Sequence, residues 1–336
     1  MNIIELMNVP PEDHNKEWLK RALQWAVQLE LATIPPYLCA WLSIEVDDSQ
    51  NQYVTESINT IVIEEMIHMG LACNLLTTIG GAPVINTSTV VPTYPTDGLP
   101  GGVKPGFRIA LKPLSPQQVE KFMELELPET PPIEAALAVE EEHFPTIGEF
   151  YDAILEAFRR LPESEYTGQH QVTAGGLTAI LNFGQAKDAI TKIKRQGEGT
   201  SESPEESDGQ TAIDLAHYYR FREIYRGHKF IKDADGRWIN DPNPLPFPSQ
   251  ISNMAEVPAG GYPESRPFDI KYTQLLDGLQ RTWEITPQSA ANTELRNAIG
   301  TMRRLVEPAL ELMSTPIDPE HPDRGNFGPS FLLIRE

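Results

Sequence analysis

The sequence predicts a mainly α-helical protein, with a four-helix bundle at its centre, long irregular insertions and two additional helices near the C-terminus. Apolar residues recur at alternating steps of three and four along several long segments, which is the helical period. Single glutamates interrupt two of these apolar stripes. The connections between the helical segments are rich in the chain's 30 prolines and 23 glycines, which predicts irregular chain.

The composition is that of a globular protein. Its 336 residues are 40% hydrophobic and 22% charged, enough for one large or two ordinary domains. The formal net charge of −21 argues against nucleic acid or an anionic membrane as a partner, because both bind basic surfaces. Cys39 and Cys73 lie in apolar helical patterns and are expected to be free thiols. With no signal-peptide pattern and no apolar run long enough to span a bilayer, we expect a cytoplasmic protein.

Two long helices are expected in the first 80 residues. The first covers residues 15 to 46, with Asp13 or Asn15 as its N-cap. Pro35 and Pro36 interrupt its pattern, so the helix either bends there or ends and restarts. The second covers residues 50 to 79 and is terminated by the sequence Gly-Gly-Ala-Pro that follows.

The remaining chain alternates between shorter helices and irregular segments. Helices are expected from Ser115-Pro116 to about Glu126, from about 133, and over 145–161, 180–196, 211–229, 268–284 and 290–314. The acidic stretch 197–210 and the segment 231–266 are expected to be irregular. We therefore expect residues 1–230 to form the bundle with its insertions. Residues 231–336 would form an irregular wrap and two C-terminal helices packed on it, in one structural unit.

The stretch "EEMIHMG" in the second helix places a carboxylate and an imidazole on one face. Glu65 and His68 lie in the apolar stripe formed by Ile58, Ile61, Ala72, Leu75 and Ile79. A Glu-x-x-His pair of this kind supplies two ligands to a metal in a helical bundle. The alternative is an exposed Glu65 beside a satisfied core histidine. Glu64 lies on a more polar stripe and is expected to be an outer-shell or solvent-facing residue.

The first helix supports the metal interpretation. Glu30 lies in the apolar stripe of Leu23, Val27 and Ile34, with no basic residue near it in sequence. Buried carboxylates need neutralisation, and two divalent metal ions would balance four of them. Two antiparallel helices with Glu30, Glu65 and His68 would provide half of a dinuclear site.

The second half of the site is less clear from the residues alone, because no second intact Glu-x-x-His occurs. Glu149 also fits a capping box with Thr146, and Glu198 also fits a solvated loop after a helix end. His217 shares a helix face with Ile213, Phe221 and Ile224. The full set of candidates is Glu140, Glu141, Glu142, His143, Glu149, Glu198, His217, Glu223 and His228.

Several separate motifs along the whole chain resemble one known family. They are "LELATIPPYLCAWLSI", "EEMIHMGLACNLLTTIGGAP", "PTYPTDGLPGG", "TIGEFYDAI", "RQGEGT", "HYYRFREI" and "AIGTMRRL" with the closing "GPSF". They are similar to the ferritin-like domain of the iminophenyl-pyruvate dimer synthase family, named for large violacein- and rebeccamycin-pathway proteins that couple tryptophan-derived imines. The resemblance implies a ferritin-like bundle with two metals held by Glu30, Glu65, His68, Glu149, Glu198 and His217. Glu198 and His217 would then be a Glu-x-x-His divided by an acidic insertion.

The expected function is that of a dinuclear non-haem metal oxidase or oxygenase. Mixed carboxylate and imidazole ligands suit iron, with manganese as the alternative. The partners would be O2 or peroxide and a small organic substrate, such as an amino-acid-derived imine or an aromatic compound. Trp25, Tyr37 and Trp41 lie near Glu30 in sequence and would either line the pocket or pack in the core. The rival hypotheses are a non-catalytic iron-handling or accessory protein and a fold whose site has decayed. The oligomeric state is open, a homo-oligomer included.

Overall fold

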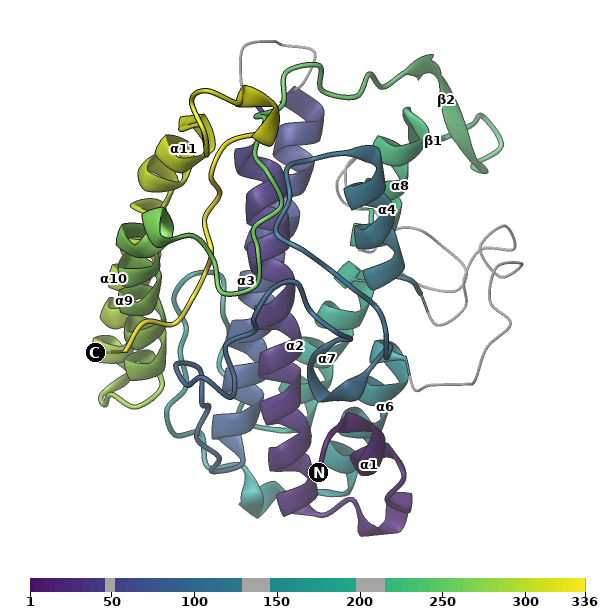
Figure 1. The fold of residues 1–336 in the computed structure, drawn as a ribbon. Helices are drawn as coiled ribbons and strands as arrows, with labels where there is room; N and C mark the ends of the chain where they lie inside the picture. The colour runs from purple at the N-terminus through teal and green to yellow at the C-terminus, as the bar shows by residue number, and fades with distance from the viewer. Residues whose placement is uncertain (46–51, 129–145, 198–214, 336) are drawn as a thin grey trace.

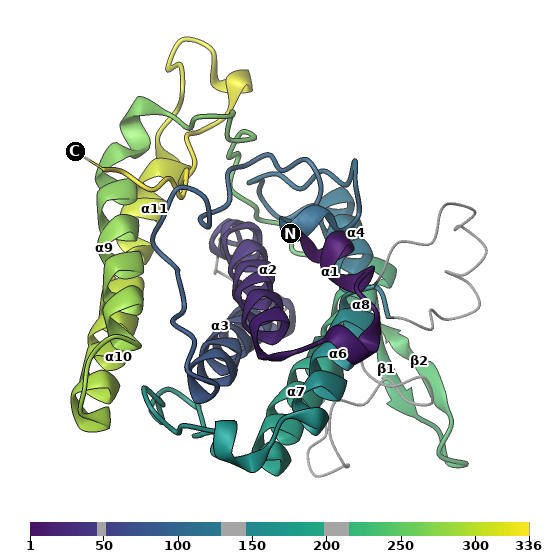
Figure 2. The ribbon, with the colours of Figure 1, turned by 90° about the horizontal axis from the view of Figure 1, so that it is seen from below.

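The computed structural model describes residues 1–45, 52–128, 146–197 and 215–335, and it confirms the mainly helical prediction. Two long antiparallel helices, α2 (Lys16–Leu42) and α3 (Gln52–Thr78), form the central layer. Four shorter helices lie on one side of this layer and three C-terminal helices on the other, as Figures 1 and 2 show from two directions.

Helix α2 runs without a break through the two prolines. Its N-cap is Asn15, whose side chain accepts the backbone N–H groups of Glu17 and Trp18. A proline within a helix cannot donate to the carbonyl four residues earlier, so Pro36 leaves the Ala32 carbonyl without its usual donor. The hydroxyl of the buried Tyr94 donates to the Ala32 oxygen at 2.7 Å instead. A side chain from the irregular segment after α3 therefore completes the hydrogen bonding of α2.

Helix α3 ends at Thr78, where the predicted glycine pair follows. Gly80 adopts a left-handed conformation with φ of +72°, and the N–H of Gly81 returns to the Leu76 carbonyl. Within the described residues, α3 alone is long and apolar enough to cross a membrane. However, 72% of its most apolar window is buried inside the protein, as expected for the core helix of a bundle.

The helices beside α2 and α3 form two pairs, one above the other. The upper pair is α4 (Pro116–Leu125) with α8 (His217–Arg226), and the lower pair is α6 (Ile147–Arg160) with α7 (Phe183–Gly197) (Figure 1). One region facing the middle of α2 and α3 collects residues from four helix ends. These are the end of α4, the start of α6, the end of α7 and the start of α8.

The C-terminal part contains more regular structure than expected. Strands β1 (His228–Lys232) and β2 (Trp238–Pro244) pair antiparallel, where the end of a helix and then irregular chain from residue 231 were predicted. After α9 (Arg266–Thr282), the single helix expected over 290–314 is divided into α10 (Gln288–Arg303) and α11 (Val306–Ser314). The chain also begins with a short helix, α1 (Ile3–Met7). The expected helix from about 133 lies outside the described residues.

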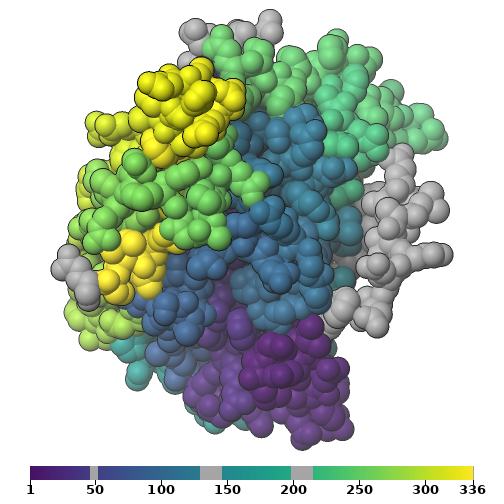
Figure 3. All heavy atoms as spheres, in the orientation of Figure 1, coloured from purple at the N-terminus to yellow at the C-terminus, as the bar shows by residue number. Residues whose placement is uncertain are grey.

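Two extended segments cover the central helices. The segment 83–113 contains no helix of more than three residues or strand and lies across one face of the molecule, between the N-terminal and C-terminal parts (Figure 3). The C-terminal tail runs along α9. The N–H groups of Ser330, Leu332 and Ile334 donate to side chains spaced four residues apart in or beside α9: Ser265, Asp269 and Thr273.

The regular spacing of these tail contacts has a geometrical cause. Four helical residues rise by about 6 Å, and two extended residues by about 6.6 Å. An extended chain can therefore offer every second N–H to every fourth side chain of a parallel helix, which holds the tail in place.

Candidate metal centre

Glu65 lies at the centre of a buried cluster of carboxylates and imidazoles. Its side chain is 3% exposed, and its Oε1 atom lies 3.5 Å from Nδ1 of His68 and 2.9 Å from Nδ1 of His217. The inward orientation of Glu65 and His68 predicted from the helical phase of α3 is therefore present. The exposed position considered as the alternative for Glu65 is wrong.

Two groups of three residues share Glu65. The first is Glu30, Glu65 and His68, and the second is Glu65, Glu126 and His217. Within each group the three candidate ligand atoms lie within 4.8 Å of one another, and all the residues are buried. The distance from Nδ1 of His68 to Oε2 of Glu30 is 3.6 Å, and that from Nδ1 of His217 to Oε2 of Glu126 is 3.8 Å.

Glu126, which follows the last residue of α4, was not among the candidate ligands predicted from the sequence. A signal was present, because Val119, Phe122 and Glu126 follow the same three-and-four spacing that identified Glu30 and Glu65. Val119 and Phe122 are fully buried, so this stripe faces the core and carries Glu126 to the cluster.

The structure does not bring every candidate into the cluster. Glu149 forms the capping box with Thr146 that was its competing explanation: its carboxylate accepts the Thr146 N–H at 2.8 Å. Its role as a ligand stays a prediction. Glu223 accepts hydrogen bonds from the Tyr53 hydroxyl and the Phe230 N–H, and His228 contacts the Asp241 carbonyl. Outside the described residues lie Glu140, Glu141, Glu142, His143 and Glu198.

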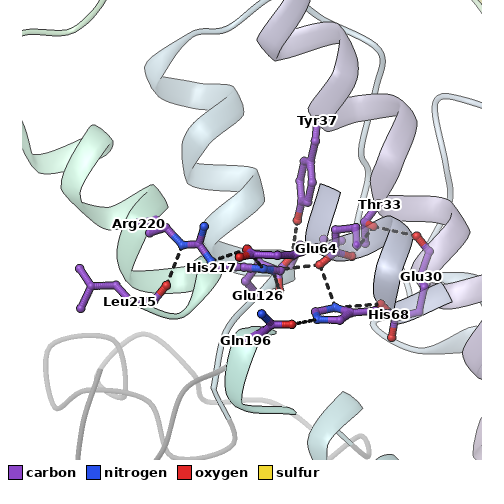
Figure 4. A network of polar contacts seen from close by, with 12 residues as sticks. Glu30, Thr33, Tyr37, Glu64, His68, Glu126, Gln196, Leu215, His217 and Arg220 are labelled. Carbon is purple, nitrogen blue, oxygen red and sulfur yellow. Dashed lines mark hydrogen bonds and ion pairs between the residues drawn. The ribbon is translucent and has the colours of Figure 1, made fainter. Parts of the chain in front are cut away.

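Each histidine of the cluster is oriented by one outer residue (Figure 4). Nε2 of His68 lies 2.8 Å from Oε1 of Gln196 in α7, and Nε2 of His217 lies 3.0 Å from Oε2 of Glu64. Because both partner oxygens accept a hydrogen bond, these contacts place the N–H on Nε2 and direct the other nitrogen, Nδ1, to the carboxylates. Glu64 is thus an outer residue rather than a solvent-facing one, and Arg220 pairs with it.

One face of α2 supports all three carboxylates. Glu30, Thr33 and Tyr37 follow each other at steps of three and four. The Thr33 hydroxyl donates to Oε2 of Glu65 at 2.5 Å, and the Tyr37 hydroxyl donates to Oε1 of Glu126 at 2.5 Å. Glu30 itself accepts a hydrogen bond from Tyr151 of α6.

The three aromatic residues considered as pocket or core residues pack in the core or against it. Tyr37 is fully buried, with its ring against Phe122 and Phe221, and it also holds a carboxylate of the cluster. The indole N–H of Trp25 donates to the Met1 carbonyl, at the far end of α2 from Tyr37. Trp41 is partly buried against the core.

Comparison of the chain with the sequence profiles of known families identifies its family. The profile of the ferritin-like family matches residues 23–226, which is more than half of the chain and includes every described residue of the cluster. The chain belongs to the ferritin-like family. A crystal structure of a ferritin-like protein from Caulobacter vibrioides is similar, with a TM-score of 0.60 and 21% identity. The match covers 87% of this chain and 93% of that one, and at this identity it shows the fold. No curated protein matches the sequence.

The residues present in this ferritin-like protein fit a metal. Nδ1 of His217 is fully buried and has no hydrogen bond among the described residues, although Oε1 of Glu65 is only 2.9 Å away. When His217 is neutral and its single ring proton is on Nε2, directed to Glu64, two lone pairs face each other there. Ligand atoms about 2.1 Å from one ion lie about 3.0 to 3.4 Å apart, close to the separations in this cluster. A cation between them would remove the repulsion.

Without metal, protons must balance the same charges. Burial raises the pKa of Glu30. For Glu65 burial acts in the same direction, but the adjacent imidazoles of His217 and His68, when protonated, outweigh it and lower the pKa. Burial would lower the pKa of His68, but Glu30 and Glu65 raise it to about 10. The cluster therefore stabilises positive charge at Nδ1, where a metal would bind.

A cavity opens beside the cluster at the meeting point of the helix ends. Its volume is about 50 Å³, room for roughly four water molecules. Glu30, Thr33, Glu65, His68, Glu126 and Tyr151 line its inner part. Its other lining residues are mainly apolar: Leu29, Leu99, Leu125, Ile147 and Ile193, together with Lys194 and Gly197. The cluster is thus accessible to a small molecule while remaining largely shielded from water.

Proposed function

We propose that this ferritin-like protein is a dinuclear non-haem metal oxidase or oxygenase that acts on a small organic substrate, with iron as its metal. The observation that carries the proposal is the position of Glu65, which belongs to two groups of ligand residues at once. A carboxylate shared in this way can bridge two ions, with Glu30 and His68 on one side and Glu126 and His217 on the other.

The donor set supports iron or manganese. The two groups offer carboxylate oxygens and imidazole nitrogens, a mixture that suits these metals. Two divalent ions carry four positive charges, and Glu30, Glu65 and Glu126 supply three negative ones. A fourth carboxylate would complete the balance, which is the role that we propose for Glu149 or Glu198.

The residues of the chain would bind the metals and the substrate, orient the metal ligands and exclude water from the site. When bound, the metals would supply the electrons and the open coordination position needed for chemistry with O2 or peroxide. Gln196 and Glu64 hold Nδ1 of the two histidines toward the metals. Thr33, Tyr37 and Tyr151 each hold one carboxylate in place. The apolar walls would position the substrate and keep bulk water away.

The cavity favours an enzyme over the iron-handling alternative. A lining of leucine and isoleucine side chains suits the body of an organic molecule, whereas passage of hydrated iron would call for a polar lining. The resemblance to the iminophenyl-pyruvate dimer synthase family supports an oxidative reaction and suggests an amino-acid-derived imine or an aromatic compound as the substrate.

The proposal is tested first by elemental analysis of the purified protein. We expect about two iron or manganese ions per chain in the wild type and less than half of that in Glu65→Gln, which removes the shared ligand. Glu56→Gln is the matched control, because Glu56 is exposed on the same helix. A wild type that folds without bound metal would refute the dinuclear site.

Oxygen consumption then separates the two functional classes. In the loaded wild type, O2 uptake that requires an added organic reductant or substrate and is lost in Glu65→Gln would support the oxidase. Uptake of iron far beyond two ions per chain, with O2 consumed by added iron alone, would instead identify an iron-handling protein.

A further inference from the structure

A lysine is among the described residues that line the cavity beside the cluster. Of its described lining residues, Lys194 alone carries a side-chain ammonium or guanidinium group, and it lies in the last turn of α7. The candidate ligands Glu30, Glu65, Glu126 and His68 also line the cavity and are more deeply buried than Lys194. A molecule in the cavity would therefore have Lys194 on its more exposed side and the carboxylates on its buried side.

The position of Lys194 marks the outer end of the cavity. Its side chain is 21% exposed, whereas Glu65 and His68 are 3% and 1% exposed. Nζ of Lys194 lies 2.7 Å from Oδ1 of Asp152 in α6, so this ion pair bridges the two helices at the opening. Asp152 is 55% exposed.

The exposure of Asp152 makes it an exchangeable partner. An exposed ion pair contributes little net stability, because water solvates each partner when the pair separates. A carboxylate on an incoming molecule could therefore join or replace Asp152 at Lys194, and a displaced Asp152 would return to water. The new pair would form at the edge of an apolar cavity, where it is less screened than the pair with Asp152.

We propose that Lys194 binds the carboxylate of the substrate, and that the substrate is a small organic acid with an apolar body. This inference rests on the proposed function. The apolar walls formed by Leu29, Leu99, Leu125, Ile147 and Ile193 hold the body between Lys194 and the metals. A cavity of about 50 Å³ admits a branched body of about three or four carbon atoms. A carboxylate at Lys194 thus directs the carbon atoms, rather than the charge, to the metals.

Binding of isobutyrate to the manganese-loaded protein tests this assignment by titration calorimetry. Isobutyramide, which has nearly the same shape and no charge, is the comparison ligand. We expect isobutyrate to bind more tightly than isobutyramide. Lys194→Gln should weaken isobutyrate binding by about tenfold, as expected for losing a hydrogen bond to a charged group, and should leave isobutyramide unchanged. Lys192→Gln, at an exposed position one turn or less away on α7, is the matched control and should bind both as the wild type does.

A second variant changes the same pair in the opposite direction. Asp152→Asn removes the carboxylate that competes for Lys194 and should tighten isobutyrate binding. Equal isobutyrate affinity in Lys194→Gln and Lys192→Gln, or equal affinity of the wild type for acid and amide, would overturn the assignment; the first result would mean that the acid binds the metals directly. The manganese content, measured on each sample first, separates failure of this subsite from failure of the metal centre.

Discussion

The hydrogen bond from Tyr94 to α2 gives the sharpest test of how the central helix is built around the site. Pro36 cannot donate to the Ala32 carbonyl, and the Tyr94 hydroxyl does so at 2.7 Å. Tyr94→Phe removes that donor and keeps the ring, which is 4% exposed. Leaving a buried carbonyl unsatisfied costs about 1 to 3 kcal/mol, so we expect the free energy of unfolding to fall by that amount. Urea unfolding followed by circular dichroism measures it.

A double-mutant cycle makes the explanation specific. In a Pro36→Ala background the backbone N–H of residue 36 can bond the Ala32 carbonyl, so Tyr94→Phe should cost at least about 1 kcal/mol less there. Tyr166→Phe is the control, because the Phe158 carbonyl that accepts from Tyr166 also accepts the Leu161 N–H. Its cost should stay below about 1 kcal/mol. Equal costs of Tyr94→Phe in both backgrounds would refute the reasoning.

Two further predictions concern the C-terminal tail and the second ligand group. Burial raises the pKa of Asp269 from 3.8 to about 7, so between about pH 4 and 7 the native state keeps a proton that the unfolded state loses, and the free energy of unfolding falls as the pH rises. Asp269→Asn should therefore gain stability relative to wild type over this range, by up to roughly 4 kcal/mol in urea titrations at each pH. For Asp277, burial is outweighed by the ion pair with Arg335, which lowers the pKa, so Asp277→Asn should instead lose stability relative to wild type as the pH rises; the same sign for both variants would contradict the assignment. Glu126→Gln should lower the metal content by about one ion per chain, with the exposed Glu124→Gln unchanged; full occupancy in Glu126→Gln would remove Glu126 from the ligand set.

Helical phase was sufficient to predict that Glu30, Glu65 and His68 face the core. Glu30, Glu65 and His68 lie in long apolar stripes, and a stripe of this length can face only the core. The same rule identifies Glu126 when it is applied to the shorter helix α4. Helical phase also turns Gln196 inward, after Ala189 and Ile193, but its contact with His68 could not be predicted because it depends on how α7 packs against α3.

Other differences between expectation and structure also have physical causes. The break between α10 and α11 follows from Pro308, which cannot donate to the carbonyl of residue 304 and so ends the preceding helix. The β1–β2 hairpin has few buried side chains, so no clear alternation of apolar and polar residues marks it. Its turn, Asp233-Ala-Asp-Gly236, was the local signal for a hairpin.

The most direct test of the metal centre is anomalous diffraction from crystals of the iron- or manganese-loaded protein. We predict two anomalous peaks per chain, both within bonding distance of Glu65. One should also contact Nδ1 of His68 and the other Nδ1 of His217. The same maps would show whether Glu149 or Glu198 supplies the fourth carboxylate. A single peak, or peaks that do not contact Glu65, would contradict the shared-ligand arrangement on which the proposed function rests.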